Sequence, residues 1–415
     1  MTTVETFVDL AGHTRFVGRA DFTRSRGAVS TTFRYDAGYL ADRETINIDP
    51  SLRLVEGAQH VTGLLAAFAD TAPDRWGRNL IDRAERAGAR AEGRRPRSHD
   101  DVDYLLAVSD NTRQGALRFR MAGDAEFVGE PSRVPQQISL PHLLHASDRL
   151  SADAEATEAV KELLNTGTTG LGGARPKASV LLEDGSLGIA KFPHASDEWD
   201  VIAWEAAALD LLGDAGIRVP QHERVRVADR SILLLRRFDR DHHSARRAYV
   251  SAMTATGSRD GDRRDYADIF AAMRDMADAP RDESRELYDR VIASVALGNT
   301  DDHLRNHGFV AVGPRWALSP AFDVNPNPDL AKSRATSIAG ATEHDDEIEG
   351  LLSLADDAGL TLDQARRRFA HMAAVMKNWH ESAARHGIPA REVAMMADSI
   401  EPRLEAVAKA GSAGS

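Results

Sequence analysis

The sequence contains no cysteine. Disulfide bonds, thiolate metal sites and a cysteine nucleophile are therefore excluded. It also has no apolar run of about 18 residues or more, the length that a membrane-spanning helix needs. Residues 1–12 are polar and have neither the basic segment nor the apolar segment of a signal peptide. We therefore expect a cytoplasmic protein with no membrane contact.

Basic residues are also fewer than acidic residues, with 52 lysines and arginines against 64 aspartates and glutamates. The formal net charge is −12 and the sequence pI is near 5.7, which argues against a surface that binds nucleic acid by itself. We therefore expect DNA to be contacted only through a partner. The 415 residues are 42% hydrophobic and 28% charged, as in an ordinary globular protein with room for two domains. Lysine is rare, and its positions are Lys161, Lys177, Lys191, Lys332, Lys377 and Lys409.

Oxygen ligands are densest in residues 297–323. Apolar residues recur at helical spacing before this segment, which predicts a buried helix that delivers the chain to a polar loop. Asp301 is followed five positions later by Asn306, and Asp323 comes after a short apolar stretch. A kinase uses this order, with Asp301 accepting or orienting the proton of an attacking hydroxyl and the other two residues holding magnesium against ATP phosphates.

Two other interpretations of this segment remain open. The residues Asp301, Asp302, His303, His307 and Asp323 could be ligands in a metal-dependent hydrolase, because the two histidines would share one face if the segment were helical. The polar residues could also be ordinary loop chemistry that satisfies nearby backbone groups.

A glycine-rich segment upstream favours the kinase interpretation. Residues 167–178 contain four glycines, whose backbone amides can approach a phosphate closely. Two strands joined by a tight turn follow, over 178–182 and 187–193, and the second carries Lys191 near its end. A glycine loop beside a strand-borne lysine is typical of an ATP-phosphate clamp, in which the lysine acts as a point charge.

The next elements fit the same order. The apolar pattern over 197–215 predicts a helix carrying Glu205, our candidate to pair with Lys191, with a solvent-facing glutamate as the alternative. The run 232–235 predicts a buried strand, and the segment 236–240 that leaves it would be the hinge, where backbone atoms contact adenine.

The rest of the chain predicts a small β-rich module and a helical end. We expect a hairpin over 7–20, helix over 61–91 broken at Pro73, an exposed linker over 86–97, a strand near 116–119 and a helix over 139–165. Further helices are expected over 269–276, 287–297, 348–358, 362–380 and 390–410, with a disordered tail over 411–415.

Five motifs, in this order, resemble those of the HipA-like serine/threonine kinase family. They are Gly172 to Ala178, Ala190 to Pro193, Arg237 to Arg240, Gly298 to Phe309 and Leu318 to Asp323. Pro73 to Arg78 and Gln114 to Phe119 are similar to parts of that family's smaller first domain. The resemblance covers nearly the whole chain.

The resemblance implies a role for each matching residue. Asp301, Asn306 and Asp323 would be the catalytic residues, the last two as magnesium ligands. Lys191 would bind ATP, and His303 would help to shape the nucleotide pocket.

The resemblance also implies a nucleotide site in two parts. The loop residues that would close over the phosphates are Gly172, Gly173, Ala174, Arg175 and Lys177. The residues that would hold the adenosine are Arg236, Phe238 and Asp239.

One position departs from the family pattern. Members commonly carry an autophosphorylated serine just before the glycine-glycine-alanine segment, where this sequence has Gly170. Thr168 or Thr169 could take that role with a small shift. A phosphate there would place negative charge where ATP phosphates bind, and would therefore inactivate the enzyme.

The resemblance implies a two-lobed α+β kinase fold. Its parts would be a β-rich subdomain over 1–150 and a kinase domain over 151–410, with lobes over 151–240 and 241–410. The implied activity uses ATP and Mg²⁺ to phosphorylate a protein serine or threonine. Family members are toxins of toxin-antitoxin pairs that phosphorylate an aminoacyl-tRNA synthetase, and a HipB-like helix-turn-helix antitoxin restrains them. The alternatives are a metal-dependent phosphohydrolase and an inactive pseudokinase that acts in operon repression.

Overall fold

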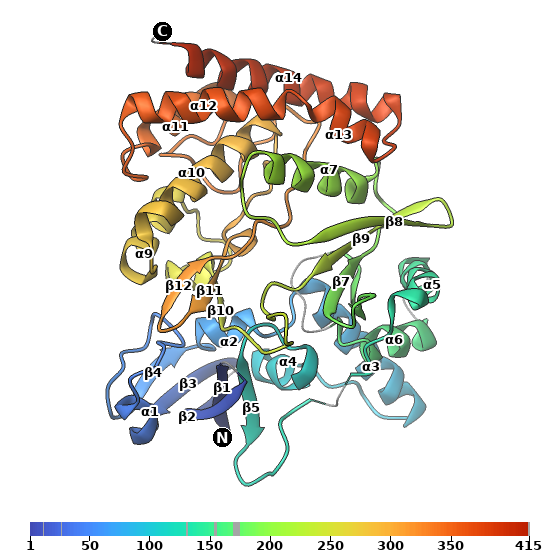
Figure 1. The fold of residues 1–415 in the computed structure, drawn as a ribbon. Coiled ribbons are helices and arrows are strands. Elements are labelled where there is room, and N and C mark those ends of the chain that lie inside the picture. Colours follow the sequence, from blue (N-terminus) through green and yellow to red (C-terminus); the bar gives the residue numbers. More distant parts are fainter. Residues whose placement is uncertain (11, 26, 130–131, 153–155, 169–174, 414–415) are drawn as a thin grey trace. The chain divides into compact units, whose positions relative to one another are not determined.

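The computed structural model describes residues 1–415 apart from 11, 26, 130–131, 153–155, 169–174 and 414–415 (Figure 1). The chain divides into two compact units, one of residues 1–196 and 225–250 and one of residues 197–224 and 251–415. Each is described by itself. Among the described residues, no helix combines the length and the apolar character needed to cross a membrane.

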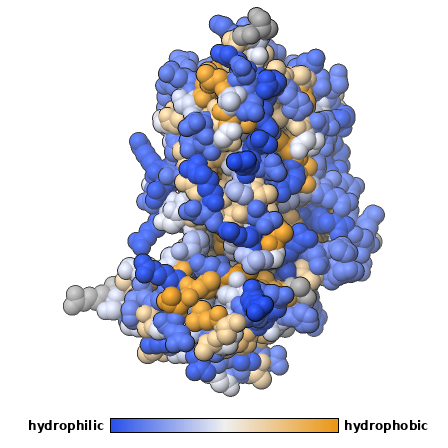
Figure 2. Space-filling model, turned by 60° about the vertical axis from the view of Figure 1, so that its left-hand side comes forward, coloured by the Kyte–Doolittle hydropathy of each residue, from blue (hydrophilic) through white to orange (hydrophobic). Residues whose placement is uncertain are grey.

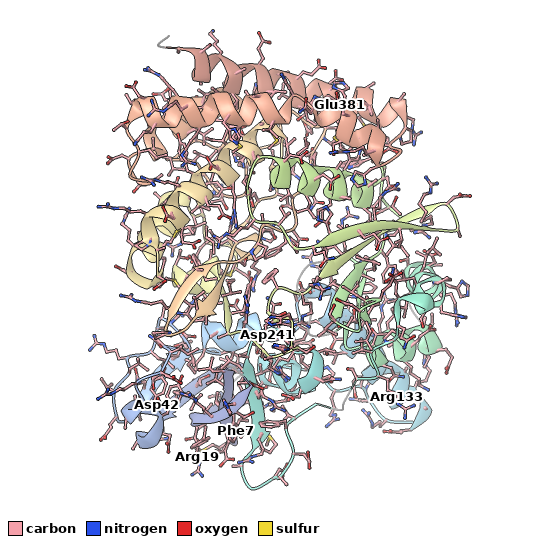
Figure 3. All side chains as sticks on the ribbon, viewed as in Figure 1. Phe7, Arg19, Asp42, Arg133, Asp241 and Glu381 are labelled. Atoms are coloured by element: carbon pink, nitrogen blue, oxygen red, sulfur yellow. The ribbon has the colours of Figure 1, made fainter. Side chains whose placement is uncertain are left out.

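The first unit begins with a five-stranded sheet in the order β4-β3-β2-β1-β5 (Figure 1). The predicted hairpin is confirmed as β1 and β2, on which Figure 3 labels Phe7 and Arg19. One face of the sheet is buried because aromatic rings of three strands pack against Phe68. The strands are β1 (Thr2–Leu10), β2 (His13–Ser25), β3 (Ala28–Tyr35), β4 (Gln59–Thr62) and β5 (Leu117–Met121).

The helices of the first unit correct three expectations. The helix predicted over 61–91 is interrupted at Pro73 as expected, but its first residues belong to β4, and the expected linker over 86–97 is helical as far as Ala91. Trp76 and Leu80 at the start of α3 pack into a core shared with α5 and α6, and Ala89 near its end is fully buried. The predicted helix over 139–165 is two helices. The helices are α1 (Ala37–Ala41), α2 (Ala66–Asp70), α3 (Arg75–Ala91), α4 (Asp101–Ala107), α5 (Leu140–Ala152) and α6 (Thr157–Asn165), with 3-10 turns η1 (Asp110–Thr112) and η2 (Gln137–Ser139).

A second sheet of the first unit has the order β6-β7-β9-β8. The strands predicted on either side of the tight turn are confirmed, and they pair antiparallel with Lys177 opposite Lys191. Apolar residues of this sheet pack against α5 to form one core. The strands are β6 (Lys177–Leu181), β7 (Leu187–Lys191), β8 (His222–Val227), which belongs to this unit from Val225, and β9 (Arg230–Arg236).

The second unit is mainly helical, and α12 and α14 lie side by side in it (Figure 1). Helix α12 begins with a capping box of Thr361 and Gln364, and α10 begins with Pro280, where a missing N–H costs nothing. The elements are α7 (Val201–Asp214), α8 (Ala252–Ala255), α9 (Tyr266–Met276), α10 (Pro280–Ala296), β11 (Gly308–Val312), β12 (Arg315–Leu318), α11 (Glu347–Leu354), α12 (Leu362–Met376), α13 (Trp379–Arg385) and α14 (Ala390–Ser412), with 3-10 turns η4 (Leu304–Asn306) and η5 (His344–Asp346); β10 (Tyr249–Ser251) lies where the chain passes from the first unit to the second.

Two expectations for this unit are corrected. The predicted helix over 362–380 is two helices, α12 and α13. The tail was expected to be disordered from Gly411, but α14 continues to Ser412. Gly411 lies so close to Ala370 that an added Cβ would be 2.6 Å from its backbone nitrogen, so this turn packs onto α12. Residues 414–415 lie outside the described residues.

The surface agrees with the charged composition. The face drawn in Figure 2 is mainly hydrophilic, with hydrophobic residues gathered in smaller patches. The large hydrophobic residues that are most exposed are Met1, Leu54, Val55, Val312 and Leu362.

Candidate active site

The predicted delivery helix is α10, and the chain leaves it through Gly298. This glycine has a φ of 65°, and an added Cβ would lie 2.8 Å from Ser399 Oγ on α14. A side chain would therefore be strained here and would also collide with the Ser399 hydroxyl. The polar segment 299–307 thus begins at a residue whose conformation favours glycine.

The two consecutive aspartates have opposite environments. Asp301 is exposed, whereas Asp302 is buried. Asp302 pairs with His307 at 3.0 Å and accepts hydrogen bonds from Tyr266 and Ser294. The protein therefore uses the second carboxylate to anchor the loop and leaves the first at the surface, where a substrate hydroxyl can reach it.

The pKa of Asp302 lies well below its ordinary value. Burial raises this pKa, but His307 lowers it through its charge and hydrogen bond, and Tyr266 and Arg334 lower it further. The loop is therefore held by a carboxylate that stays ionised in the folded chain.

This shift predicts how stability responds to acid. Because the pKa of Asp302 is below the ordinary value of about 3.9, its contribution is present above about pH 4 and is lost as the pH falls further. We expect the free energy of unfolding of Asp302→Asn to fall less between about pH 5 and pH 3 than that of the wild type, measured by urea denaturation. The exposed Asp345 gives the control Asp345→Asn, which should follow the wild type. Parallel curves for wild type and Asp302→Asn would contradict the assignment.

The two proposed magnesium ligands are held differently. The Nδ2 of Asn306 donates to the backbone oxygen of Asp301 at 3.1 Å, which leaves its Oδ1 as the atom that can bind a cation. Asp323 has a φ of 56°, a left-handed conformation uncommon for aspartate. Its N–H donates to Oε1 of Glu205 at 3.2 Å, so the buried Glu205 supports this backbone. The solvent-facing alternative for Glu205 is wrong, because this side chain is 2% exposed.

A buried network of ion pairs, which the sequence analysis did not predict, also supports the 299–307 loop. Arg334 donates to Ser294 Oγ at 2.7 Å and to the backbone oxygen of Asn299 at 3.2 Å. It also pairs with Glu347 at 2.8 Å, and Glu347 pairs with Arg403 of α14 at 3.2 Å. The side chains of all three ionic residues are 1% exposed. The loop is therefore tied to α11 and α14.

His303 and His307 do not share one face of a helix, as the hydrolase interpretation requires. His303 and His307 flank the single 3-10 turn η4, and the Nε2 of His307 faces Asp302. Within the described ranges, no group of three or more His, Asp or Glu side chains has the geometry to hold a metal ion.

In the first unit, the two lysines of the predicted phosphate clamp lie opposite each other. Lys177 and Lys191 are cross-strand neighbours, 3% and 7% exposed. Like charges directly opposite each other in a sheet repel.

The remaining loop residues are described only in part. Gly172, Gly173, Ala174 and Thr169 lie outside the described residues, and Arg175 is half-buried just before β6. Thr168 is fully buried, and its Oγ1 donates to the backbone oxygen of Lys177. Phosphorylation of Thr168 would first require its hydroxyl to leave this contact.

The predicted adenosine residues leave β9 in different environments. Arg236 pairs with Asp184 of the β6–β7 turn, and Phe238 packs its ring 6.0 Å from that of Tyr249. Asp239 is buried at 3% exposed, and its carboxylate accepts hydrogen bonds from Arg237, Arg240 and the backbone of Gly115. Asp239 thus forms buried hydrogen bonds within the protein that the sequence did not predict.

Comparison with known proteins places this geometry in a family. Residues 169–379 match the HipA-like C-terminal domain. The solved structure of HipA from Shewanella oneidensis MR-1, in a toxin-antitoxin complex with HipB and operator DNA, has a TM-score of 0.68 to this chain. The two share 14% identity, over 98% of this chain and 96% of that one. This likeness confirms the predicted kinase-like α+β fold.

A curated relative matches part of the chain. Y4mE of Sinorhizobium fredii, whose name describes it as a presumed kinase, is 24% identical over 233 residues. The match covers 49% of this chain and 54% of Y4mE, so the chain spans about half the length of this relative.

Proposed function

Because this chain belongs to the HipA-like kinase family, we propose that it transfers the γ-phosphoryl group of ATP to a serine or threonine of a protein, with Mg²⁺ as cofactor. The observation that carries the proposal is the pair Asp301 and Asp302: one carboxylate is exposed, and the other anchors its loop. An exposed carboxylate on a firmly anchored loop suits a catalytic group that must contact its substrate in a fixed position.

The chain's own residues suggest how the reaction would proceed. Asp301 would accept the hydroxyl proton or orient the hydroxyl as it attacks phosphorus. Asn306 Oδ1 and the carboxylate of Asp323 are hard oxygen donors and therefore fit magnesium. Bound Mg²⁺ would neutralise charge that develops on the phosphate oxygens. Lys191 and Lys177 would attract the phosphates, and His303 would border the nucleotide.

The likeness to a HipA solved with HipB and operator DNA supports further proposals. We propose that the chain is the toxin of a toxin-antitoxin pair and that a HipB-like helix-turn-helix protein restrains it. Its substrate would be a translation component such as an aminoacyl-tRNA synthetase. The net charge of −12 fits DNA contact through that partner alone.

The activity is tested with radiolabelled ATP. Wild-type protein should transfer label to protein in the presence of Mg²⁺, and Asp323→Asn should need a higher Mg²⁺ concentration for the same rate because one hard ligand is lost. Mass spectrometry after brief induction, compared with Asp301→Asn, would identify the phosphorylated protein. Steady phosphate release without protein labelling would indicate a hydrolase, and thermal stabilisation by ATP without turnover would indicate a pseudokinase. Either result would overturn the proposal.

A further inference from the structure

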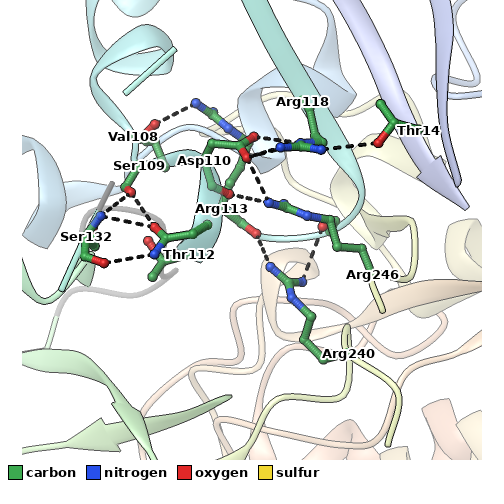
Figure 4. A network of polar contacts seen from close by, with 12 residues as sticks. Thr14, Val108, Ser109, Asp110, Thr112, Arg113, Arg118, Ser132, Arg240 and Arg246 are labelled. Carbon is green, nitrogen blue, oxygen red and sulfur yellow. Dashed lines mark hydrogen bonds and ion pairs between the residues drawn. The ribbon is translucent and has the colours of Figure 1, made fainter. Parts of the chain in front are cut away.

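The segment that leaves β9 is attached to a turn of the N-terminal module, residues 110–115. Arg237 donates to the backbone oxygens of Thr112 at 2.6 Å and Arg113 at 3.2 Å. Arg240 donates to those of Arg113 at 2.9 Å and Gly115 at 3.3 Å (Figure 4). Three carbonyl groups of the turn, those of Thr112, Arg113 and Gly115, thus accept hydrogen bonds from a segment more than 100 residues away.

A third arginine extends the attachment to the start of the turn. Arg246 donates to the backbone oxygen of Asp110 at 2.5 Å and to its carboxylate at 3.3 Å (Figure 4). The same carboxylate accepts from Arg118 of β5 at 2.6 Å. Asp110 therefore joins the sheet of the N-terminal module to the segment after β9.

Asp239 makes the reciprocal contact. Its Oδ2 accepts from the backbone N–H of Gly115 at 2.7 Å, from Arg237 at 2.5 Å and from Arg240 at 2.9 Å, and its Oδ1 accepts from Arg237 Nε at 2.8 Å. Burial raises the pKa of Asp239, but Arg237 and Arg240 lower it by a larger amount. The net shift is therefore downward. The acceptor positions of this carboxylate are therefore occupied by protein donors.

Gly115 is required at its position. It has a φ of 74°, and an added Cβ would lie 3.3 Å from both Cβ and N of Tyr249. A side chain would be strained by the backbone and would push Tyr249, whose ring packs on Phe238. Tyr249 therefore links the turn to the proposed adenosine residue Phe238, because its Cβ and backbone nitrogen lie beside Gly115 and its ring packs on Phe238.

The charge balance shows that burying this network costs free energy and that the network is stable only in one geometry. The network contains two aspartates, Asp110 and Asp239, and five arginines: Arg113, Arg118, Arg237, Arg240 and Arg246. Burial lowers the pKa of Arg113 and of Arg240 to about 9. Buried guanidinium groups in excess of carboxylates persist only when carbonyl oxygens satisfy them in a fixed geometry. The turn supplies those oxygens to Arg237, Arg240 and Arg246, whereas Arg113 of the turn donates to carbonyl oxygens of Thr71, Leu105 and Val108.

We propose that Asp239 is a positioning residue that braces the nucleotide hinge against the 110–115 turn, so that the N-terminal module sets the affinity for ATP. This inference rests on the proposed function, because it takes the segment after β9 as the hinge. It differs from the role implied by resemblance, in which Asp239 itself holds the adenosine. Anything that displaces the turn, such as a protein bound to the module, would weaken nucleotide binding.

The test uses the full chain and measures the Kd of ATP, 2′-deoxy-ATP and 3′-deoxy-ATP by calorimetry, with Mg²⁺ present. We expect Asp239→Asn and Gly115→Ala each to raise the Kd of ATP by roughly 10-fold, and the double variant to add little more, because both release the same brace. The ratio of Kd values between ATP and each deoxy analogue should be the same in Asp239→Asn as in the wild type.

A matched control lies two residues further on. Asp241, labelled in Figure 3, accepts from the backbone N–H groups of His243 and Ala245 within its own loop. Asp241→Asn should therefore leave the Kd of ATP unchanged. If Asp239→Asn does not fold, Arg240→Lys keeps the charge but loses the forked contact with two carbonyls, and should raise the Kd by a smaller factor.

Two results would overturn the inference. One is a Kd of ATP in Gly115→Ala equal to that of the wild type. The other is a wild type that discriminates against a deoxy analogue while Asp239→Asn does not, since a direct ribose contact would then be lost. Failure of the proposed function is seen separately, as absence of phosphotransfer by the wild type, because the binding measurements do not depend on turnover.

Discussion

Asp301→Asn should lower the rate of phosphotransfer by roughly 10²- to 10⁴-fold, the range of general-base catalysis. The amide keeps the size of the side chain but cannot accept the hydroxyl proton. Because Asp301 is exposed and the loop is anchored through Asp302, the substitution should leave the fold intact. We expect kcat to fall while the KM for ATP changes little, measured by transfer of label from ATP to the protein substrate.

The matched control is Asp260→Asn. Asp260 is another exposed aspartate, and it pairs with Arg305 of the same loop at 2.8 Å. Exposed pairs contribute little, so this variant should keep kcat within about twofold of the wild type. Equal losses in both variants would show that surface charge near the loop, and not the carboxylate of Asp301, controls the rate.

Glu347→Gln should cost about 3–5 kcal/mol of unfolding free energy, as expected when one partner of a buried ion pair is removed. Glu347 is the carboxylate between Arg334 and Arg403, and all three side chains are 1% exposed. Its loss leaves two buried guanidinium groups without their counter-ion. Urea denaturation at neutral pH measures the effect.

Two further variants separate charge from packing. Glu349 is exposed on the same helix, so Glu349→Gln should change stability by less than about 0.5 kcal/mol. Adding Arg403→Met to Glu347→Gln removes one of the two stranded charges, so the double variant should lose less stability than the two single losses combined. Strict additivity would show that the residues do not act as one network.

Local sequence patterns predicted the helix and strands that flank the candidate site residues. Asp301, Asn306 and Asp323 lie within one short stretch of the sequence. The predicted helix before this stretch and the predicted strands on either side of the tight turn are present. The roles of the three residues stay predictions. Helix ends were less predictable, because tertiary packing extended α3 and α14 beyond the points where the local pattern weakens.

Contacts between distant residues could not be predicted in this way. The hydrogen bond of Asp239 joins residues 124 positions apart, and that of Glu205 joins residues 118 apart. Arg403 did carry a signal. It follows Met396 and Ile400 and precedes Val407 at helical spacing, so a charge stands on the buried face of α14. Such a residue predicts a buried partner, here Glu347.

The contacts that support the 299–307 loop also have a consequence for the order of folding during synthesis. Gly298 packs against Ser399, and Arg334 reaches Arg403 through Glu347. These α14 residues are translated about 100 residues after the loop, which at 5–20 residues per second is a delay of roughly 5–20 s. The loop therefore leaves the ribosome before the α14 residues that support it are made, and we expect it to reach its final conformation only after α14 has packed.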